Sequence, residues 1–450
     1  MQHIQGISRH QLQMSSLEDK ITADNPVRFI DAFVNHIDPV KIGFKPKILK
    51  TEGRPNFRLE VFLKLYLYGY LNGVRSSRRL EKECFRNIEV QWLLEAIYPN
   101  YHSIADFRKD NPKALKQLFK LFVSFLKDAE LIAGDTIAID GTKSRAHNSK
   151  KANYNQKKID KHKAYIDAKS QEYLDQLEQN DIQENPVVIK NIQQKIEGLK
   201  QNKIKYELLE EELKNSGEPQ ISTTDADARA LLVQGQVVEV SYNIQAAVDS
   251  KHNLVVATHT INRNDKNALA AIALEVKENL ALETFTVLVD KGYHNGRELH
   301  TCKQNNITTI VAVPEQGKSN ENGTQPEYLV SKFIYNKETN SYTCPEGKTL
   351  TTTGSWHKKT GRTEESGYNF QKYRTPACKT CLVKGLCTSR NGGREIDRSQ
   401  YADAVEENHQ RYKDNPQLYR KRQEINEHIF GTIKRKWGYN YTDLVGLEKV

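Results

Sequence analysis

The sequence predicts an α/β protein in which a mixed β-sheet core is joined to an all-helical N-terminal domain and interrupted by two insertions. Three observations lead to this prediction. The first 130 residues consist of amphipathic helical segments, two β-branched runs further along each end in an aspartate, and an alternating hairpin lies between those runs. Strands and helices in this order are typical of a mixed sheet. The expected divisions are a helical domain at 1–130, core segments at 131–149, 218–315 and 416–450, a helical hairpin at 150–217 and a cysteine-containing insertion at 316–415.

Length and charge limit the class of protein and of partner. A chain of 450 residues can bury a large core in roughly two to four structural units. The formal net charge of +10 favours a polyanionic partner, either nucleic acid or an anionic membrane. No window approaches the roughly 18 apolar residues of a spanning helix, and the N-terminal MQHIQGISRHQ has no apolar signal core. We therefore expect a soluble, cytoplasmic protein.

The N-terminal domain centres on the apolar run LEVFLKLYLYGYL at 59–71. Basic residues, among them Arg54 and Arg78, flank the tyrosines and phenylalanines of this run, which suits a helical module that lies on a phosphate backbone. The alternative is a set of solvated cations around an aromatic core. Ser103 is expected to cap a further amphipathic helix.

The expected core contains two strands that end in aspartate. The run TIAID ends at Asp140 and is followed by glycine, and FTVLVD ends at Asp290. Between them lie the clearest hairpin of the chain, at 237–261, and a helix over about 267–280. A third strand is expected at 307–314. Aspartate at a strand end is often only a turn former, so either residue alone would carry little functional weight.

Residues 150–217 are dominated by Lys, Gln, Asn and Glu, with sparse isoleucine and leucine. Two long polar helices interrupted at Pro186 fit this composition, because the apolar residues are spaced to pack the pair together. We expect a coiled-coil-like arm whose charges form a solvated surface.

Four of the six cysteines lie in the turn-rich insertion at 316–415. Cys378 and Cys381 have the two-residue gap with which two thiolates hold one zinc ion, and Cys344 and Cys387 complete four sulfurs. Only one cysteine occupies the half in which a zinc ribbon usually has a pair, so free packing cysteines are the alternative. The sequence predicts a zinc-ribbon-like insertion with a structural Zn²⁺ ion.

The segment YRKRQEINEHIFGTIKRKWGY at 419–439 predicts a helix that carries one acid on a basic face. At about 100° per residue, Arg420, Glu427 and Lys434 fall in one sector, while three isoleucines lie round the other side. Lys436 adds to the positive charge. A surface helix of mixed charge would look similar.

Asp140, Asp290 and Glu427 would supply three carboxylates at one edge of the sheet. Mg²⁺ binds oxygen ligands through a few carboxylates and leaves positions for water and phosphate. Two such ions roughly 3.5 to 4 Å apart would activate a water or a 3′-hydroxyl and stabilise the leaving oxygen. The sequence therefore predicts phosphoryl transfer that depends on Mg²⁺ or Mn²⁺, with Lys434 holding a DNA phosphate.

Taken together, these motifs resemble the insertion-sequence transposases of the DDE type. GRPNF, KLYLYGYLNGVRSSRRLEKE and SIADFRKDN are similar to the helical N-terminal domain of that family. IAIDGTKSRAHNS, VLVDKGYHN and NEHIFGTIK resemble the segments that carry its first, second and third acids. The resemblance covers nearly the whole chain and extends to the cysteine-bearing insertion, which is similar to that of a subgroup.

The resemblance implies a ribonuclease-H-like core, with Asp140, Asp290 and Glu427 as the metal-binding triad and Mg²⁺ as the cofactor. It also implies double-stranded DNA as the partner: the terminal inverted repeats of the element and the target. Because two ends must be brought together, a homodimer on DNA in the bacterial nucleoid is expected.

Two features depart from the family pattern. Tyr419 and Arg422 lie one residue further from Glu427 than the family's Tyr-x2-Arg-x3-Glu-x6-Lys signature requires, so their DNA contacts are only weakly implied. The chain stops at Val450, where relatives continue into another apolar helix, which predicts a truncated element. Two alternatives stay open: a metal-dependent nuclease without strand transfer, and a non-catalytic DNA-binding protein descended from a transposase.

Overall fold

A computed structural model describes residues 8, 10–12, 14–46, 55–147, 150–181, 186–234, 237–314, 324–361 and 367–450. The chain divides into two compact units. The first comprises Met1–Asp128, Lys143–Tyr242 and Phe430–Val450, and the second comprises Ala129–Thr142 and Asn243–Ile429. Arg54, which was predicted to contact DNA, lies outside the described residues. In the described part of the chain, no helix combines the length and the apolar character needed to cross a membrane.

The described residues up to Asp128 form helices and loops, as the sequence predicts. The helices are α1 (Pro26–His36), α2 (Pro39–Ile42), α3 (Leu59–Leu71), α4 (Ser77–Arg86), α5 (Ile88–Leu93), α6 (Tyr101–Asp110) and α7 (Pro112–Asp128). The apolar run is α3, whose Leu63 and Leu65 are fully buried, and α1 and α5 pack against it. A helix that is apolar on most of its surface is stable only when its neighbours cover it.

The helix expected to follow a Ser103 cap begins earlier, at Tyr101, and is capped by Asn100. The Oδ1 atom of Asn100 accepts a hydrogen bond from the Ser103 amide at 2.9 Å. Asparagine is as favourable an N-cap as serine, so the earlier residue takes this position.

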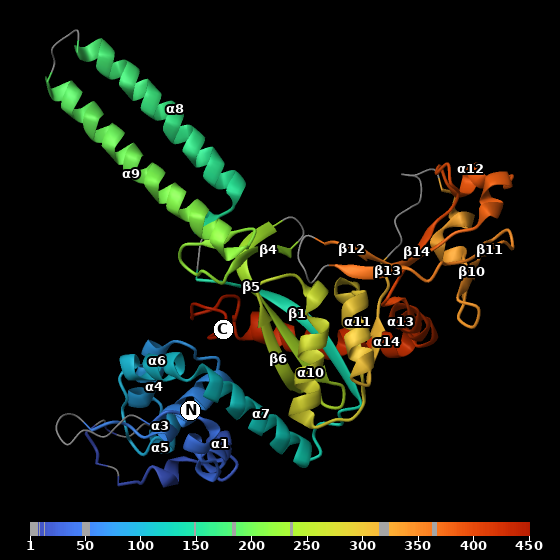
Figure 1. The fold of residues 1–450 in the computed structure, drawn as a ribbon. Helices are drawn as coiled ribbons and strands as arrows, with labels where there is room; N and C mark the ends of the chain where they lie inside the picture. The colour runs from blue at the N-terminus through green and yellow to red at the C-terminus, as the bar shows by residue number, and fades with distance from the viewer. Residues whose placement is uncertain are drawn as a thin grey trace, which may run out of the picture. The chain divides into compact units, whose positions relative to one another are not determined.

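Two long helices occupy the segment for which the sequence predicts a helical hairpin. The elements here are α8 (Gln156–Asp181), α9 (Pro186–Ser216) and, at their base, the paired strands β2 (Asn153–Tyr154) and β3 (Ile221–Ser222). Figure 1 shows α8 and α9 side by side in green. An ion pair joins them, with Lys163 Nζ 2.9 Å from Glu210 Oε2.

The central sheet has the strand order β4 (Arg229–Gln234), β5 (Val237–Asp249), β1 (Thr136–Arg145), β7 (Phe285–Val289) and β8 (Ile307–Val311), with β6 (Val255–Ile261) also paired to β5. β7 is parallel to both β1 and β8, whereas β5 is antiparallel to β4 and β6. β1 runs antiparallel to β5, because the Ser250 amide donates to the Thr136 oxygen and the Ala146 amide donates to the Val240 oxygen. This pairing confirms the predicted mixed α/β fold.

β1 does not end at Asp140, as the sequence predicted, but continues to Arg145. Its parallel pairing with β7 stops at Ala138, while a hydrogen bond to β5 is still made at Ala146, just beyond the strand. The backbone stays extended because β5 still offers hydrogen-bond partners on that side. Asp140 therefore lies where β1 loses one neighbouring strand and keeps the other.

The second unit also contains four helices that pack against or beside the sheet: α10 (Leu269–Leu280), α11 (Gly296–Gln304), α13 (Ala402–Asp414) and α14 (Pro416–Gly431). α10 packs on β6, and α11 and α13 pack on β8 (Figure 1). Ile425 of α14 is buried in a cluster with one residue from each of four strands, namely Ala138, Val248, Leu288 and Ile310. This contact fixes α14 against one face of the sheet.

The cysteine-bearing insertion contains two small antiparallel sheets and a short helix. The elements are β9 (Ile334–Asn336), β10 (Ser341–Thr343) and β11 (Thr349–Leu350), then β12 (Trp356–Lys359), β13 (Tyr368–Tyr373) and β14 (Ile396–Ser399), with α12 (Lys384–Cys387). α13 lies inside the range 316–415 but packs on the central sheet. Asn408 of α13 accepts from the Val311 amide at 2.9 Å and donates to the Val311 oxygen at 3.0 Å.

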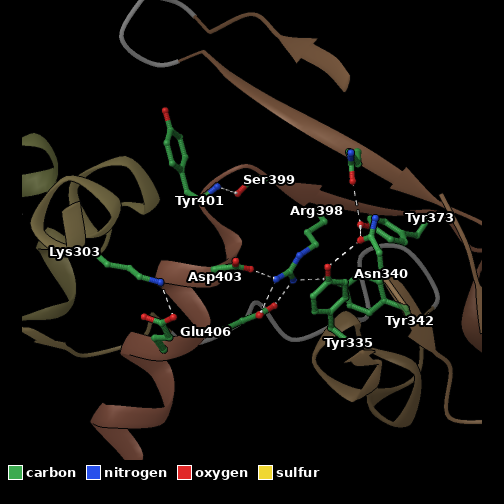
Figure 2. Close-up of polar contacts among 12 residues, drawn as sticks. Lys303, Tyr335, Asn340, Tyr342, Tyr373, Arg398, Ser399, Tyr401, Asp403 and Glu406 are labelled. Carbon is green, nitrogen blue, oxygen red and sulfur yellow. Dashed lines mark hydrogen bonds and ion pairs between the residues drawn. The ribbon is translucent and has the colours of Figure 1, made fainter. Parts of the chain in front are cut away.

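A buried arginine connects the insertion to α13 (Figure 2). Arg398 of β14 is 7% exposed, and its guanidinium donates to the carboxylates of Asp403 and Glu406 on α13. It also donates to the Tyr342 hydroxyl at 2.9 Å and stacks 3.6 Å above the ring centroid of Tyr335. A buried cation is costly unless it is paired, so these partners determine how the insertion is attached.

Replacing Arg398 with methionine should loosen this attachment by about 2 to 3 kcal/mol, because charged hydrogen bonds are lost and two carboxylates lose their cation. Hydrogen exchange of the β14 and α13 amides measures that opening free energy. Lys303→Met is the control, since its ion pair with Glu407 is about half exposed and should contribute less than about 0.5 kcal/mol. Equal effects of the two substitutions would contradict the assigned role of Arg398.

Candidate active site

Asp140 and Asp290 lie at the same edge of the sheet, and a backbone amide holds each carboxylate. Asp140 Oδ1 accepts a hydrogen bond from the Gly141 amide at 2.8 Å. Asp290 directly follows β7, and its Oδ1 accepts from the Gly292 amide at 2.7 Å. Because β1 and β7 are neighbouring parallel strands, the segments that follow their paired residues lie side by side.

A third carboxylate, which the sequence patterns did not single out, lies beside these two. Asp265 begins the 3₁₀ turn Asp265–Asn267 between β6 and α10. Its Oδ1 accepts hydrogen bonds from Asn243 Nδ2 at 2.8 Å and from Gln245 Nε2 at 3.0 Å. Both amide side chains belong to β5 and are fully buried. The one available signal was its position shortly after a strand, as for Asp290 after β7.

Gly141 makes room for Asp265 and the two amides that hold it. A β-carbon on Gly141 would lie 2.3 Å from Gln245 Nε2, 2.6 Å from Asp265 Oδ1 and 2.8 Å from Asn243 Oδ1. A β-carbon on Gly292 would lie 2.9 Å from Asp290 Oδ1 and at an ordinary contact distance of 3.7 Å from Asp265 Oδ2. Neither glycine has a positive φ, so at Gly141 the requirement is for space rather than for an unusual backbone conformation. Asp265 thus lies between the residue that follows Asp140 and the turn that follows Asp290.

The neighbouring carboxylates affect the pKa of Asp140. Burial raises the pKa of Asp140 above its ordinary value, and the negative charges of Asp290 and Asp265 raise it further. The Gly141 amide and the Arg422 guanidinium act in the opposite direction. Asp140 is therefore a carboxyl group whose ionised form needs positive charge nearby.

Tyr293 fixes the orientation of the amide that holds Asp265. Burial, together with the charges of the three aspartates, keeps the pKa of Tyr293 well above its ordinary value. The protonated hydroxyl donates a hydrogen bond to Gln245 Oε1. With its oxygen engaged in this way, Gln245 presents its nitrogen to Asp265.

α14 brings a cation to the site. Arg422 Nη1 lies 3.4 Å from Asp140 Oδ2, and the arginine side chain is 13% exposed. Asn426, one helical turn further, is 1% exposed, and neither polar atom of its side chain has a hydrogen-bond partner among the described residues. The buried face of α14 thus carries Arg422, Ile425 and Asn426.

Glu427, the third predicted acid, is exposed on α14. It is one residue beyond the buried Asn426, and one residue turns the helix by about 100°. Asp140 and Asp290 are thus gathered together with Asp265, whereas Glu427 faces solvent. Within the described ranges, no three His, Cys, Asp or Glu side chains are placed closely enough to hold a metal ion as they stand.

The other predicted DNA contacts differ in exposure. Arg420, Lys436 and Arg78 are exposed. Lys434 follows α14 in the π-helical segment Thr432–Lys436 and donates to the Lys143 oxygen at 2.8 Å. Burial, followed by the charge of Lys143, lowers the pKa of Lys434. Three of these cations are thus available to a polyanion, while Lys434 is half-buried and already bonded.

The four clustered cysteines Cys344, Cys378, Cys381 and Cys387 line one small cavity of about 30 Å³. Burial raises the pKa of Cys387, the Arg394 cation opposes this shift, and the other three thiols add to it. The Lys348 amide donates to Cys344 Sγ at 3.2 Å, an interaction that also stabilises a thiolate. Cys84 and Cys302, by contrast, are isolated and buried.

The donor chemistry of both clusters can be compared with that of metal ions. At the sheet edge, three carboxylates are accompanied by Asn243 Oδ1, a buried amide oxygen without a partner among the described residues. Hard oxygen donors of this kind fit Mg²⁺ or Mn²⁺. Four sulfurs around one cavity fit Zn²⁺. By donor type alone, the first cluster matches a hard divalent cation and the second matches zinc, although neither is assembled as a metal site among the described residues.

The fold and site together define an α/β protein with aspartates gathered at one edge of a mixed sheet, beside an arginine-bearing helix. Two family models match the chain: "Transposase domain (DUF772)" over residues 15–110 and "Transposase DDE domain" over residues 343–450. These matches support an insertion-sequence DDE transposase. The second match includes the four clustered cysteines and Glu427, whereas the three aspartates lie outside both. Neither a curated protein nor a solved structure matches the chain.

Replacing Gly141 with alanine should displace the buried side chains around Asp265, because the new methyl group would overlap with Asp265 and Asn243. Overpacking of this kind costs about 1 to 3 kcal/mol, which thermal unfolding can measure. Gly198→Ala in α9 is the control, since its β-carbon would meet open space and the helix should gain up to about 1 kcal/mol. A Gly141→Ala protein as stable as the wild type would contradict this geometry.

Proposed function

We propose that this protein is a transposase that binds the terminal inverted repeats of its element, cleaves the DNA there and joins the freed 3′-hydroxyls to target DNA. The observation that carries this proposal is the gathering of Asp140 and Asp290 on adjacent strands, with Asp265 between them. Carboxylates in this arrangement suit phosphoryl transfer, because they can hold a divalent cation against phosphate oxygens. The two transposase-domain matches support the choice of DNA as the substrate.

Asp140 and Asp290 would hold Mg²⁺ or Mn²⁺, with Glu427 joining them from α14. When bound, the cation supplies Lewis-acid activation of the attacking hydroxyl and charge stabilisation at the leaving oxygen. The amides of Gly141 and Gly292 orient the two carboxylates for this task.

A ribonuclease-H-like core is supported by the order and direction of the strands. β6, β5 and β1 form an antiparallel set, and β7 and β8 extend it with parallel pairing. The first two acids are carried by β1 and by the residue after β7, at the centre of this sheet.

DNA binding would use basic side chains from both compact units. Arg420, Lys436 and Arg78 are exposed and would contact phosphates, as would Arg422 once it leaves Asp140, together with Lys434 and Arg54. The net charge of +10 supports such a role. Synapsis of two element ends makes a homodimer on DNA the expected assembly, in the cytoplasm and associated with the nucleoid.

A structural Zn²⁺ ion is proposed for the insertion. Four thiols surround one cavity in a segment of short strands and turns, and such segments often depend on a metal for their stability. As in a zinc ribbon, the four cysteines and their zinc ion would keep the insertion folded and would take no part in the cleavage or joining of DNA.

Asp140→Asn should abolish DNA cleavage and leave DNA binding intact, because the amide loses the negative charge that holds the cation but keeps the shape of the side chain. The assays are gel shift and cleavage with DNA that carries the inverted repeats flanking the coding region. Asp135→Asn is the matched control, since Asp135 precedes the same strand and is exposed. Cleavage by the Asp140→Asn protein would show that the first acid is wrongly assigned.

The same assay separates the two alternative functions. With ends that have already been cleaved, the wild-type protein should form strand-transfer products. A protein that cuts DNA but never joins such ends is a nuclease. A protein that binds the ends without cutting or joining them is a DNA-binding descendant of a transposase.

Freshly reduced protein should contain about one zinc ion per chain, and Cys381→Ser should lose most of it. Elemental analysis measures the content, and Cys302→Ala, at a buried cysteine outside the cluster, is the control. Reduced wild-type protein without zinc would rule out this site.

A further inference from the structure

We propose that Asp265 is a further metal-ligating carboxylate of the site formed by Asp140 and Asp290. This inference rests on the proposed function, because it assigns to Asp265 a share of the same divalent cation. It adds a residue that neither the sequence pattern nor the two matched segments include.

The position of Asp265 beside both acid-bearing segments supports this proposal. Asp265 Oδ1 lies beside Gly141, the neighbour of Asp140, and Asp265 Oδ2 faces Gly292, whose amide holds Asp290. Each of the two oxygens therefore approaches a different acid-bearing segment.

The hydrogen bonds that hold Asp265 also support this proposal. Two buried amides donate to a single oxygen, Oδ1, which fixes the plane of the carboxylate. Gln245 is itself oriented by the Tyr293 hydroxyl. Partners of this kind, behind a ligand, are the usual support for a metal-binding carboxylate.

The orientation of the Asn243 side chain, which is 0% exposed, also supports this proposal. Its nitrogen donates both to Asp265 Oδ1 and to the Arg263 oxygen at 3.0 Å, so the amide cannot flip without facing two acceptors. Its Oδ1 is therefore forced to the other side, where it lies 2.8 Å from the β-carbon position of Gly141 and has no partner among the described residues. A buried oxygen that has no hydrogen-bond partner and lies beside carboxylates is available as a ligand for a cation.

The test is a titration of the full-length protein with Mn²⁺ alone, followed by calorimetry. Asp265→Asn should weaken Mn²⁺ binding by about tenfold or more, as Asp140→Asn should, while Asp135→Asn should leave it unchanged. Asp265→Glu keeps the charge but moves the carboxylate by one methylene, so it should also weaken binding. Circular dichroism checks that each variant is folded. If Asp265→Asn does not fold, Asp265→Glu is the variant that tests the inference.

The outcomes separate this inference from the proposed function. If Asp140→Asn weakens Mn²⁺ binding while the folded Asp265 variants stay within about twofold of the wild type, Asp265 is a structural residue and the inference fails. If the wild-type protein binds no Mn²⁺, or Asp140→Asn binds it unchanged, the cation site of the proposed function fails, and the inference fails with it. Non-additive losses in the Asp140→Asn, Asp265→Asn double variant would show that the two residues share one ion.

Discussion

Mutual repulsion among Asp140, Asp265 and Asp290 is the constraint on which the rest of the site depends. Neighbouring negative charges repel each other, so each carboxylate must be held by hydrogen-bond donors in fixed positions. Backbone amides of the following residues hold Asp140 and Asp290, and two buried amide side chains of β5 hold Asp265. Gly141, Asn243 and Gln245 belong to paired strands, whereas Gly292 belongs to the turn after β7. The pairing of β1 with β5 and β7 therefore places Asp140 near Asp290 and near the amides that hold Asp265.

α14 is the other part of this balance. Ile425 anchors the helix on four strands, and from the same face Arg422 reaches Asp140. Glu427, one residue beyond the buried Asn426, faces solvent. Arg422 places a positive charge beside Asp140. Under the proposed function, Glu427 of the same helix would supply the third carboxylate for the cation.

The features that could be predicted from the sequence are those that depend on residues close together in the chain. The β-branched runs before Asp140 and Asp290, the polar helical hairpin and the apolar α3 are patterns within a dozen or two residues, and each appears in the structure. Asp265 could not be found in this way, because its role depends on Asn243 and Gln245 of another strand and on a glycine of a third. The extension of β1 to Arg145 likewise depends on its distant partner β5. Exposure of Glu427 follows from the packing of Ile425, which helical periodicity alone does not determine.

The most direct test of this account uses the wild-type protein. Fe²⁺ bound in place of Mg²⁺, with peroxide and ascorbate, cuts the backbone next to the groups that hold it, and mass spectrometry of the fragments locates the cuts. The account predicts cuts in three separate segments, around Asp140, Asp265 and Asp290, and all three should disappear together when Mg²⁺ is added in excess. Cuts confined to other segments, or cuts at Asp140 and Asp290 without any near Asp265, would contradict it.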